Sequence, residues 1–124
     1  MPVNKKWEVE YSDEFEEWWE TLPEDVQEAI AHDIDVLEQV GPTLGRPQVD
    51  TLKDSKHRNL KELRTEHGGR QYRTLFAFDP RRTAILLIGG DKTGDRRFYK
   101  DCIRKADDIY DKHLNDLRSK GTIK

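Results

Sequence analysis

Cysteine is nearly absent from this chain, because only Cys102 occurs among the 124 residues. A single thiol excludes an internal disulfide and a cysteine metal cluster, and such sparing use of cysteine is typical of a reducing compartment. Long apolar runs are also missing, so no segment reaches the length that a membrane-spanning helix needs, and no signal peptide opens the sequence. We therefore expect a cytoplasmic protein that has no membrane partner.

Motifs for nucleotide, metal or covalent chemistry are missing as well. The chain contains no nucleophile elbow, Walker loop, dinucleotide fingerprint or zinc-binding HExxH. Residues 89–94 (GGDKTG) have glycines and a lysine but lack the GxxxxGK[ST] spacing of a phosphate loop. The four histidines are scattered, and none is paired at the spacing of metal ligands. We expect neither a metal nor a cofactor.

Charge, in contrast, is abundant and sorted by position. Residues 1–40 carry two lysines against thirteen acidic residues, a balance of −11, whereas residues 41–106 have a balance of +8. The net charge of −3 hides this division. A basic region of this size can hold phosphates, and an acidic face discourages indiscriminate nucleic-acid binding. Two solvated faces of opposite charge explain the same pattern equally well.

Apolar periodicity in the first 41 residues predicts a strand followed by two helices. Residues 7–11 alternate between apolar and polar side chains, and Ser12 then has the character of an N-cap. Aromatic residues at positions 15, 18 and 19 form one stripe of a short helix, which we expect to face the core. Pro23 and Gly41 are expected to start and end the second helix. The two helices would form an acidic hairpin.

The remainder predicts three strands and a long helix. Strands are expected at residues 60–66, 71–78 and 83–88, the last of them central and covered, with a loop containing at most a short strand before them. A flexible loop at 89–94 and a helix at about 98–118 follow. The fold class is therefore α+β, with the order β-α-α-β-β-β-α and a small, mainly antiparallel sheet packed by the hairpin and the C-terminal helix. We expect one domain over residues 1–124, with 119–124 frayed.

Strand parity separates the cations of the basic region. If Leu63 faces the core, Glu62 and Arg64 lie on the opposite face, and Lys61 lies at the sheet edge with its stem packed. Arg73 interrupts an apolar strand, where its charge needs an anion or a carboxylate beside it.

With Lys92 and Tyr99, these residues suit RNA cleavage without a metal. Arginine and lysine would neutralise the phosphate, and Glu62, Tyr99 or Lys92 would transfer protons. Alternatively, Glu62 simply pairs with Arg64 or Arg73 in a ladder of opposite charges.

Three segments resemble the RelE/ParE toxin superfamily: residues 60–64 (LKELR), 73–76 (RTLF) and 86–92 (LLIGGDK). The resemblance extends over about residues 7–112 and is strongest to the HigB-like branch, which is related to phage-derived proteins. It implies an endonuclease that cleaves ribosome-bound mRNA and is neutralised by a cognate antitoxin, often a helix-turn-helix protein. DNA would then be bound only through the antitoxin complex. For antitoxin docking, the acidic hairpin and the basic face are both candidates.

The resemblance also assigns roles to individual residues. Arg73 matches the arginine at the scissile phosphate, Arg64 the basic residue that ends the preceding strand, Lys92 the basic loop, and Tyr99 a tyrosine near the C-terminus. Two features depart from the pattern: Leu60 and Glu62 replace lysines of the first meander strand, and the long helix after Tyr99 would partly cover the site. Further cations are expected to contact RNA: Lys56, His57, Arg58, Lys61, Arg96 and Arg97.

Two other functions remain open for the same fold. A non-enzymatic inhibitor of DNA gyrase would act through protein contacts, as ParE-like toxins do. An inactive member of the family would serve only as a regulatory partner of the antitoxin.

Overall fold

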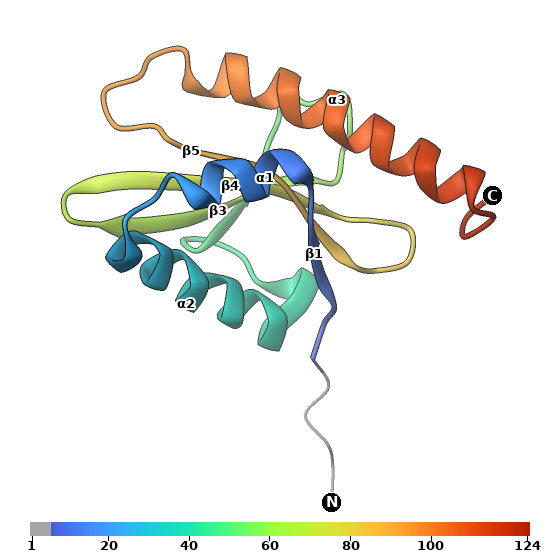
Figure 1. The fold of residues 1–124 in the computed structure, drawn as a ribbon, viewed down its shortest axis with the longest axis horizontal. Helices are drawn as coiled ribbons and strands as arrows, with labels where there is room; N and C mark the ends of the chain where they lie inside the picture. Colours follow the sequence, from blue (N-terminus) through green and yellow to red (C-terminus); the bar gives the residue numbers. More distant parts are fainter. Residues whose placement is uncertain (1–5) are drawn as a thin grey trace, which may run out of the picture.

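The computed structural model describes residues 6–124 and confirms the α+β class (Figure 1). One edge strand, β2, is added to the expected order. The elements are β1 (Val9–Tyr11), α1 (Asp13–Glu20), α2 (Glu24–Val40), a 3-10 turn (Gly41–Thr43), β2 (Val49–Thr51), β3 (Leu60–His67), β4 (Arg70–Phe78), β5 (Ala84–Asp91) and α3 (Phe98–Ser119).

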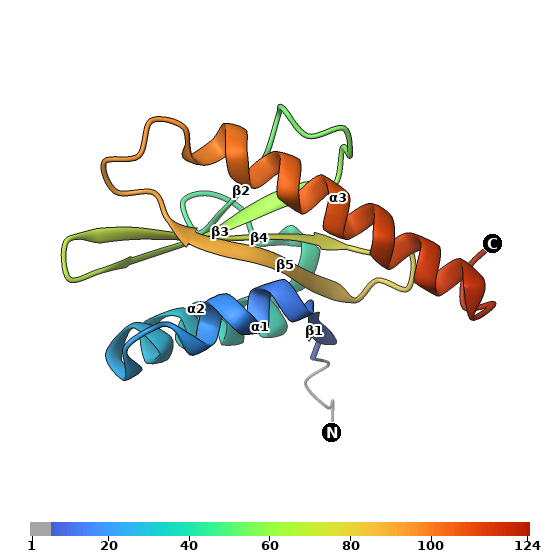
Figure 2. The same cartoon turned by 45° about the horizontal axis from the view of Figure 1, so that its top comes forward.

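The strands form a five-stranded sheet in the order β1-β5-β4-β3-β2. Only β1 and β5 run parallel, and the other neighbours are antiparallel. The expected strand 83–88 corresponds to β5, which is covered on both faces, although β4 takes the middle position. Helix α3 covers one face, while α1 and α2 cover the other, so that the sheet is the middle of three layers (Figure 2).

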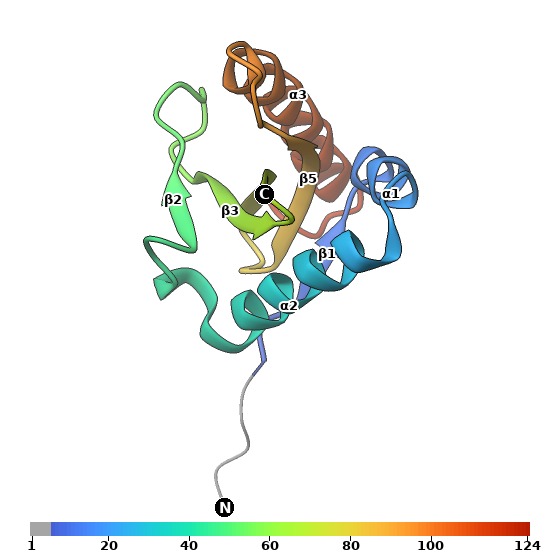
Figure 3. The same ribbon diagram turned by 90° about the vertical axis from the view of Figure 1, so that its left-hand side faces the viewer.

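Each face of the sheet has its own apolar core, because successive side chains of a strand point to opposite faces. Leu75 and Leu87 pack against Ile103 and Tyr110 of α3. Phe76 and Leu86 belong to the other core, which includes Phe15, the buried residue of the aromatic stripe. Seen end-on, α1 lies over β5 and α2 over β3 (Figure 3). Trp18 and Trp19 are half-buried against the same core, so the stripe faces inward as predicted.

Local signals set the helix boundaries where the sequence predicted them. Ser12 caps α1, since its Oγ accepts a hydrogen bond from the backbone N–H of Phe15 at 3.0 Å. The same hydroxyl donates to the carbonyl of Leu87 at 2.6 Å and thereby joins α1 to β5. Pro23 precedes α2, which ends at Gly41 with φ of 77°. None of the helices formed by residues 6–124 is long and apolar enough to cross a membrane.

The expected flexible loop at 89–94 is wrong in its first half, because β5 continues to Asp91. Its two glycines serve close packing instead. A Cβ on Gly89 would lie 2.1 Å from Cζ3 of Trp18, and one on Gly90 would lie 2.7 Å from Cε1 of Phe98. The rings therefore press on opposite faces of the strand at positions where any side chain would collide with them. A glycine pair that looks like a loop signal is here a packing requirement.

Candidate functional site

A buried charged cluster around Glu62 lies on the sheet face beneath the start of α3. Glu62 is only 3% exposed, and three side chains converge on its carboxylate. Arg64 donates from Nε and Nη2 to Oε2 at 3.3 and 3.1 Å. The Tyr99 hydroxyl donates to Oε1 at 2.7 Å, and Arg73 Nε lies 3.4 Å from the same oxygen. We call Glu62, Arg64, Arg73 and Tyr99 the Glu62 cluster.

The antiparallel register of β3 and β4 builds this cluster. Arg64 is directly opposite Arg73, and Glu62 lies two residues earlier on the same face of β3. Two arginines side by side would repel each other, so a carboxylate between them is the expected compensation. Tyr99 comes from the first turn of α3, which crosses this face of the sheet. The parity prediction for Glu62, Leu63 and Arg64 is confirmed, since Leu63 packs in the core on the α2 side.

Arg73 is 4% exposed, and its guanidinium group is surrounded by carboxylate and carbonyl oxygen atoms. Its Nη1 donates to Glu66 Oε1 at 3.1 Å and to the carbonyl of Tyr72 at 2.9 Å. Its Nε, however, is buried without a hydrogen-bond partner among the described residues. Arg64 has a second carboxylate partner in Asp50, at 3.3 Å. Both arginines are therefore charge-compensated, as in the ladder interpretation, with Arg73 buried and Arg64 half-buried.

Tyr99 and Lys92 complete the region. Burial raises the pKa of Tyr99, and the hydrogen bond to Glu62 raises it further, so its hydroxyl remains a proton donor at neutral pH. Lys92 Nζ lies 5.5 Å from the centre of the Tyr99 ring, a cation–π contact. Lys92 belongs to none of the ion pairs formed by residues 6–124. The fold thus brings four expected catalytic side chains close to Glu62, namely Arg64, Arg73, Lys92 and Tyr99.

A groove of about 430 Å³ adjoins the cluster along α3. Tyr99 lines it together with the exposed cations Lys100 and Arg104, neither of which was predicted from the sequence as a site residue. Asp54 and Asp107 also line it. The sequence did contain a signal for them, because two cations four residues apart on a helix lie on one face, and Lys100 directly follows Tyr99. Residues 92–105 therefore present a cationic surface beside the cluster.

The other expected RNA contacts are dispersed. Lys56 and His57 are both bound by Asp111 of α3, the histidine at 2.8 Å, and His57 also packs edge-on against Tyr110. They fasten the loop before β3 to the helix. Arg58 is exposed in the same loop. Lys61 donates to the carbonyl of Pro42 at 3.3 Å, on the sheet face opposite the Glu62 cluster.

Arg96 and Arg97 are exposed just before α3, and Arg97 lies 4.0 Å from Asp101. They extend the cationic surface of residues 92–105. No group of three histidine, cysteine, aspartate or glutamate side chains among residues 6–124 is arranged to hold a metal ion.

Comparison with known proteins gives the family. The profile of the family described as "Phage derived protein Gp49-like (DUF891)" matches residues 17–111. A protein of Mycobacterium tuberculosis named toxin HigB3 is 50% identical over 93 residues, which cover 74% of this chain and 80% of the relative. A second protein of that organism, named toxin HigB2, is 44% identical over 99 residues, 78% of this chain but only 49% of the relative.

A solved structure with the same fold is that of the archaeal RelE–RelB complex from Pyrococcus horikoshii OT3. The two chains superpose with a TM-score of 0.52 at 17% identity, over 72% of this chain and 98% of the other. The likeness confirms the RelE fold that the sequence predicted. This chain therefore belongs to the Gp49-like family of phage-derived proteins and is a HigB-like toxin of a toxin–antitoxin system with the RelE fold.

Proposed function

We propose that this toxin cleaves ribosome-bound mRNA without a metal and is neutralised by a cognate antitoxin. The observation that carries the proposal is the convergence of two arginines and the Tyr99 hydroxyl on one carboxylate, with Lys92 beside the Tyr99 ring. Relatives named toxin HigB support the same reading. RNA cleavage of this kind needs positive charge at the phosphate, a base for the 2′-hydroxyl and an acid for the leaving 5′-oxygen.

In this proposal each residue of the cluster has a defined task. Arg73 and Arg64 neutralise the charge that develops on the phosphate. The Glu62 carboxylate takes the proton of the 2′-hydroxyl, whose oxygen attacks the phosphorus. Tyr99 gives its proton to the departing 5′-oxygen, and the products are a 2′,3′-cyclic phosphate and a 5′-hydroxyl. The cations of residues 92–105 hold the RNA backbone beside the cluster.

The resting structure sets a condition on this chemistry. Glu62 already occupies the space between the two arginines, and Arg73 is 4% exposed. A phosphate can reach Arg73 only if Glu66 releases Nη1 or the start of α3 moves away. RNA binding must therefore exchange carboxylate contacts for phosphate contacts.

Induced expression tests the function. The wild-type chain should stop growth and produce truncated transcripts with new 5′ ends, and Arg73→Ala should abolish both effects. Arg70→Ala is the matched control, because Arg70 lies on the same strand but is 54% exposed and pairs with Asp91 away from the cluster. Growth arrest that persists in Arg73→Ala would refute the assignment of the site.

A non-enzymatic action is the second candidate, and the compensation of both arginines by carboxylates favours it. A toxin that inhibits DNA gyrase through protein contacts would stop growth with DNA damage but intact mRNA. A purely regulatory partner of an antitoxin would not stop growth at all. The same expression experiment therefore separates the three functions.

A further inference from the structure

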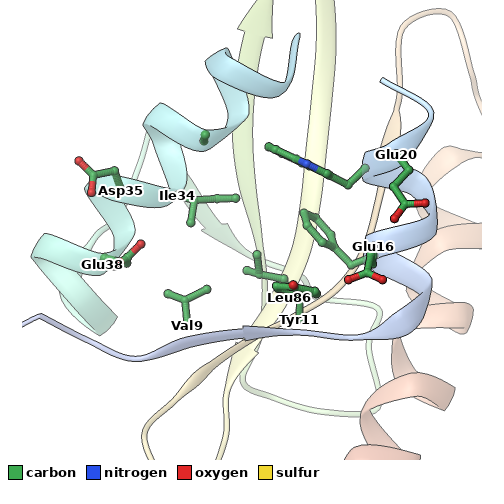
Figure 4. Close-up of a pocket in the computed structure, with 11 residues that line it drawn as sticks. Val9, Tyr11, Glu16, Glu20, Ile34, Asp35, Glu38 and Leu86 are labelled. Atoms are coloured by element: carbon green, nitrogen blue, oxygen red, sulfur yellow. The ribbon is translucent and has the colours of Figure 1, made fainter. Parts of the chain in front are cut away.

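The sheet face opposite the Glu62 cluster carries a groove of about 540 Å³ between α1 and α2. Its floor is apolar, made by Phe15 and Trp19 of α1, Ile34 of α2, and Leu86 of β5. The short edge strand β1 closes one end with Val9 and Tyr11, and Tyr11 is 58% exposed (Figure 4). Phe15 and Leu86 are buried and Trp19 and Ile34 are half-buried, so Tyr11 is the large apolar side chain of the groove that solvent reaches most. Apolar surface gathered in one hollow, rather than scattered singly, is a candidate site of interaction.

Carboxylates form the rim of this groove on both sides. Glu16 and Glu20 project from α1, and Asp35 and Glu38 from α2, flanking the apolar floor (Figure 4). No lysine, arginine or histidine of residues 6–124 lines the groove. None of these four carboxylates takes part in an ion pair formed by that part of the chain. This contrasts with the carboxylates Glu62 and Asp50 on the opposite face, which are matched by arginines of the same chain.

The combination restricts what the groove can bind. RNA is excluded by four negative charges, and a neutral apolar ligand would leave all of them without partners. Small free cations would make no favourable contact with the apolar floor. An occupant that matches both the apolar floor and the acidic rim has aliphatic side chains in its middle and lysine or arginine on both sides. It is also long enough to span from α1 to α2.

We propose that this groove binds a cationic amphipathic segment of a partner protein. Two or three aliphatic side chains of the segment fill the space over Phe15, Ile34 and Leu86, and its basic side chains meet the four rim carboxylates. The proposal goes beyond the proposed function, because the groove is separated from the Glu62 cluster by the sheet and takes no part in RNA cleavage. It also selects the acidic hairpin over the basic face as the docking surface for such a partner.

A defined peptide tests the proposal with the full-length chain. The probe is a fluorescent 14-residue helical peptide of leucine and lysine with one apolar face, titrated by anisotropy. A second peptide, in which serine replaces every leucine, has the same charge and should bind at least about tenfold more weakly. Binding of both peptides with equal affinity would overturn the proposal, because the apolar floor would then contribute nothing.

Matched charge reversals locate the binding site. Glu20→Lys with Asp35→Lys changes two exposed rim carboxylates and should weaken leucine–lysine peptide binding about tenfold. Glu17→Lys with Glu28→Lys changes two exposed carboxylates of the same helices outside the groove, and its affinity should remain within about twofold of the wild type. Equal weakening by both pairs would show non-specific attraction and overturn the proposal.

One further variant separates the groove from bulk charge. Ala31 is exposed and lines the groove, so Ala31→Gln places a neutral polar side chain there without disturbing the helix. It should weaken peptide binding at least about threefold at unchanged net charge. Unchanged affinity would place the peptide elsewhere and contradict the assignment. Cleavage of RNA is not read in any of these experiments, so their failure is distinct from failure of the proposed function.

Discussion

Glu62 is the residue on which the buried charges of the candidate site depend. Its carboxylate is the shared partner of Arg64, Arg73 and Tyr99, and it is 3% exposed. Removing one partner of a buried charge pair lowers the free energy of unfolding by more than the intact pair contributes to it, because the remaining charge stays desolvated. We therefore predict that Glu62→Ala lowers the free energy of unfolding by about 3 kcal/mol in urea denaturation.

Glu66→Ala is the control for that prediction. Glu66 also bonds to Arg73 and also lies on β3, but its side chain is 61% exposed, so water replaces the lost contact. The cost should be below about 1 kcal/mol. If the two substitutions were equally costly, Glu62 would not be the organising residue of the cluster.

At the scale of elements, the fold depends on β5 passing closely between two aromatic rings. Gly89 has no room for a side chain, because a Cβ would lie 2.1 Å from Trp18. We predict that Gly89→Ala destabilises the protein by about 2 kcal/mol, since Trp18 and α1 must shift to admit the methyl group. Gly45→Ala is the control, as its Cβ would meet only the Thr43 carbonyl at 4.0 Å, and it should change stability by less than about 0.5 kcal/mol.

A second element-scale feature is the carboxylate of Asp79, which joins the β4–β5 turn to α3. Asp79 Oδ2 accepts hydrogen bonds from Arg81 and lies 2.8 Å from Nε2 of His113, while Arg81 also reaches Glu10 of β1. Burial by itself would raise the pKa of Asp79, but the bonds from Arg81, from His113 and from the Thr83 backbone outweigh it. The net result is a lowered pKa.

The sign of the pH dependence follows from that lowered pKa. A carboxyl group that is more acidic in the folded state contributes stability above its unfolded pKa and loses it as the pH falls through the folded pKa. Asp79→Asn should therefore cost about 2 kcal/mol near pH 7, and the difference from wild type should shrink on acidification to about pH 3. Urea unfolding of both proteins at several pH values measures this, and a difference independent of pH would contradict it.

Features set by neighbouring residues were readable from the sequence, whereas those set by distant contacts were not. Local geometry alone determines the Ser12 cap, the helix boundaries at Pro23 and Gly41, and the alternation of side chains around Leu63. The roles of Gly89 and Gly90 depend on rings that arrive from α1 and α3, so the sequence predicted a loop there. The sequence also predicted that Arg64 and Arg73 need carboxylate partners. It did not identify Asp50 and Glu66 as such partners, because these contacts depend on the fold.

At the scale of the whole molecule, the sheet separates the two kinds of charge. The acidic helices α1 and α2 lie on one face and α3 on the other, as the view of Figure 2 shows. The Glu62 cluster lies on the α3 face, where Tyr99 of α3 bonds to Glu62. Seven of the sixteen lysines and arginines of residues 41–106 form ion pairs, six of them with carboxylates of the same segment. The seven are Arg46, Lys56, Arg64, Arg70, Arg73, Arg81 and Arg97. The other nine take part in no ion pair of the described residues: Lys53, Arg58, Lys61, Arg82, Lys92, Arg96, Lys100, Arg104 and Lys105. Of these, Lys92 lies over the Tyr99 ring, and Lys100 and Arg104 line the groove beside Tyr99.

The rate at which the purified toxin cleaves mRNA on ribosomes tests the central claim most directly. Arg73→Lys keeps the positive charge that Glu62 and Glu66 need, so the fold should survive, but it loses the planar guanidinium. The wild type should cleave, Arg73→Lys should cleave at least about a hundredfold more slowly, and the exposed control Arg70→Lys should cleave within about threefold of the wild-type rate. An Arg73→Lys protein that is folded and cleaves at the wild-type rate would show that the chemistry does not occur at the Glu62 cluster.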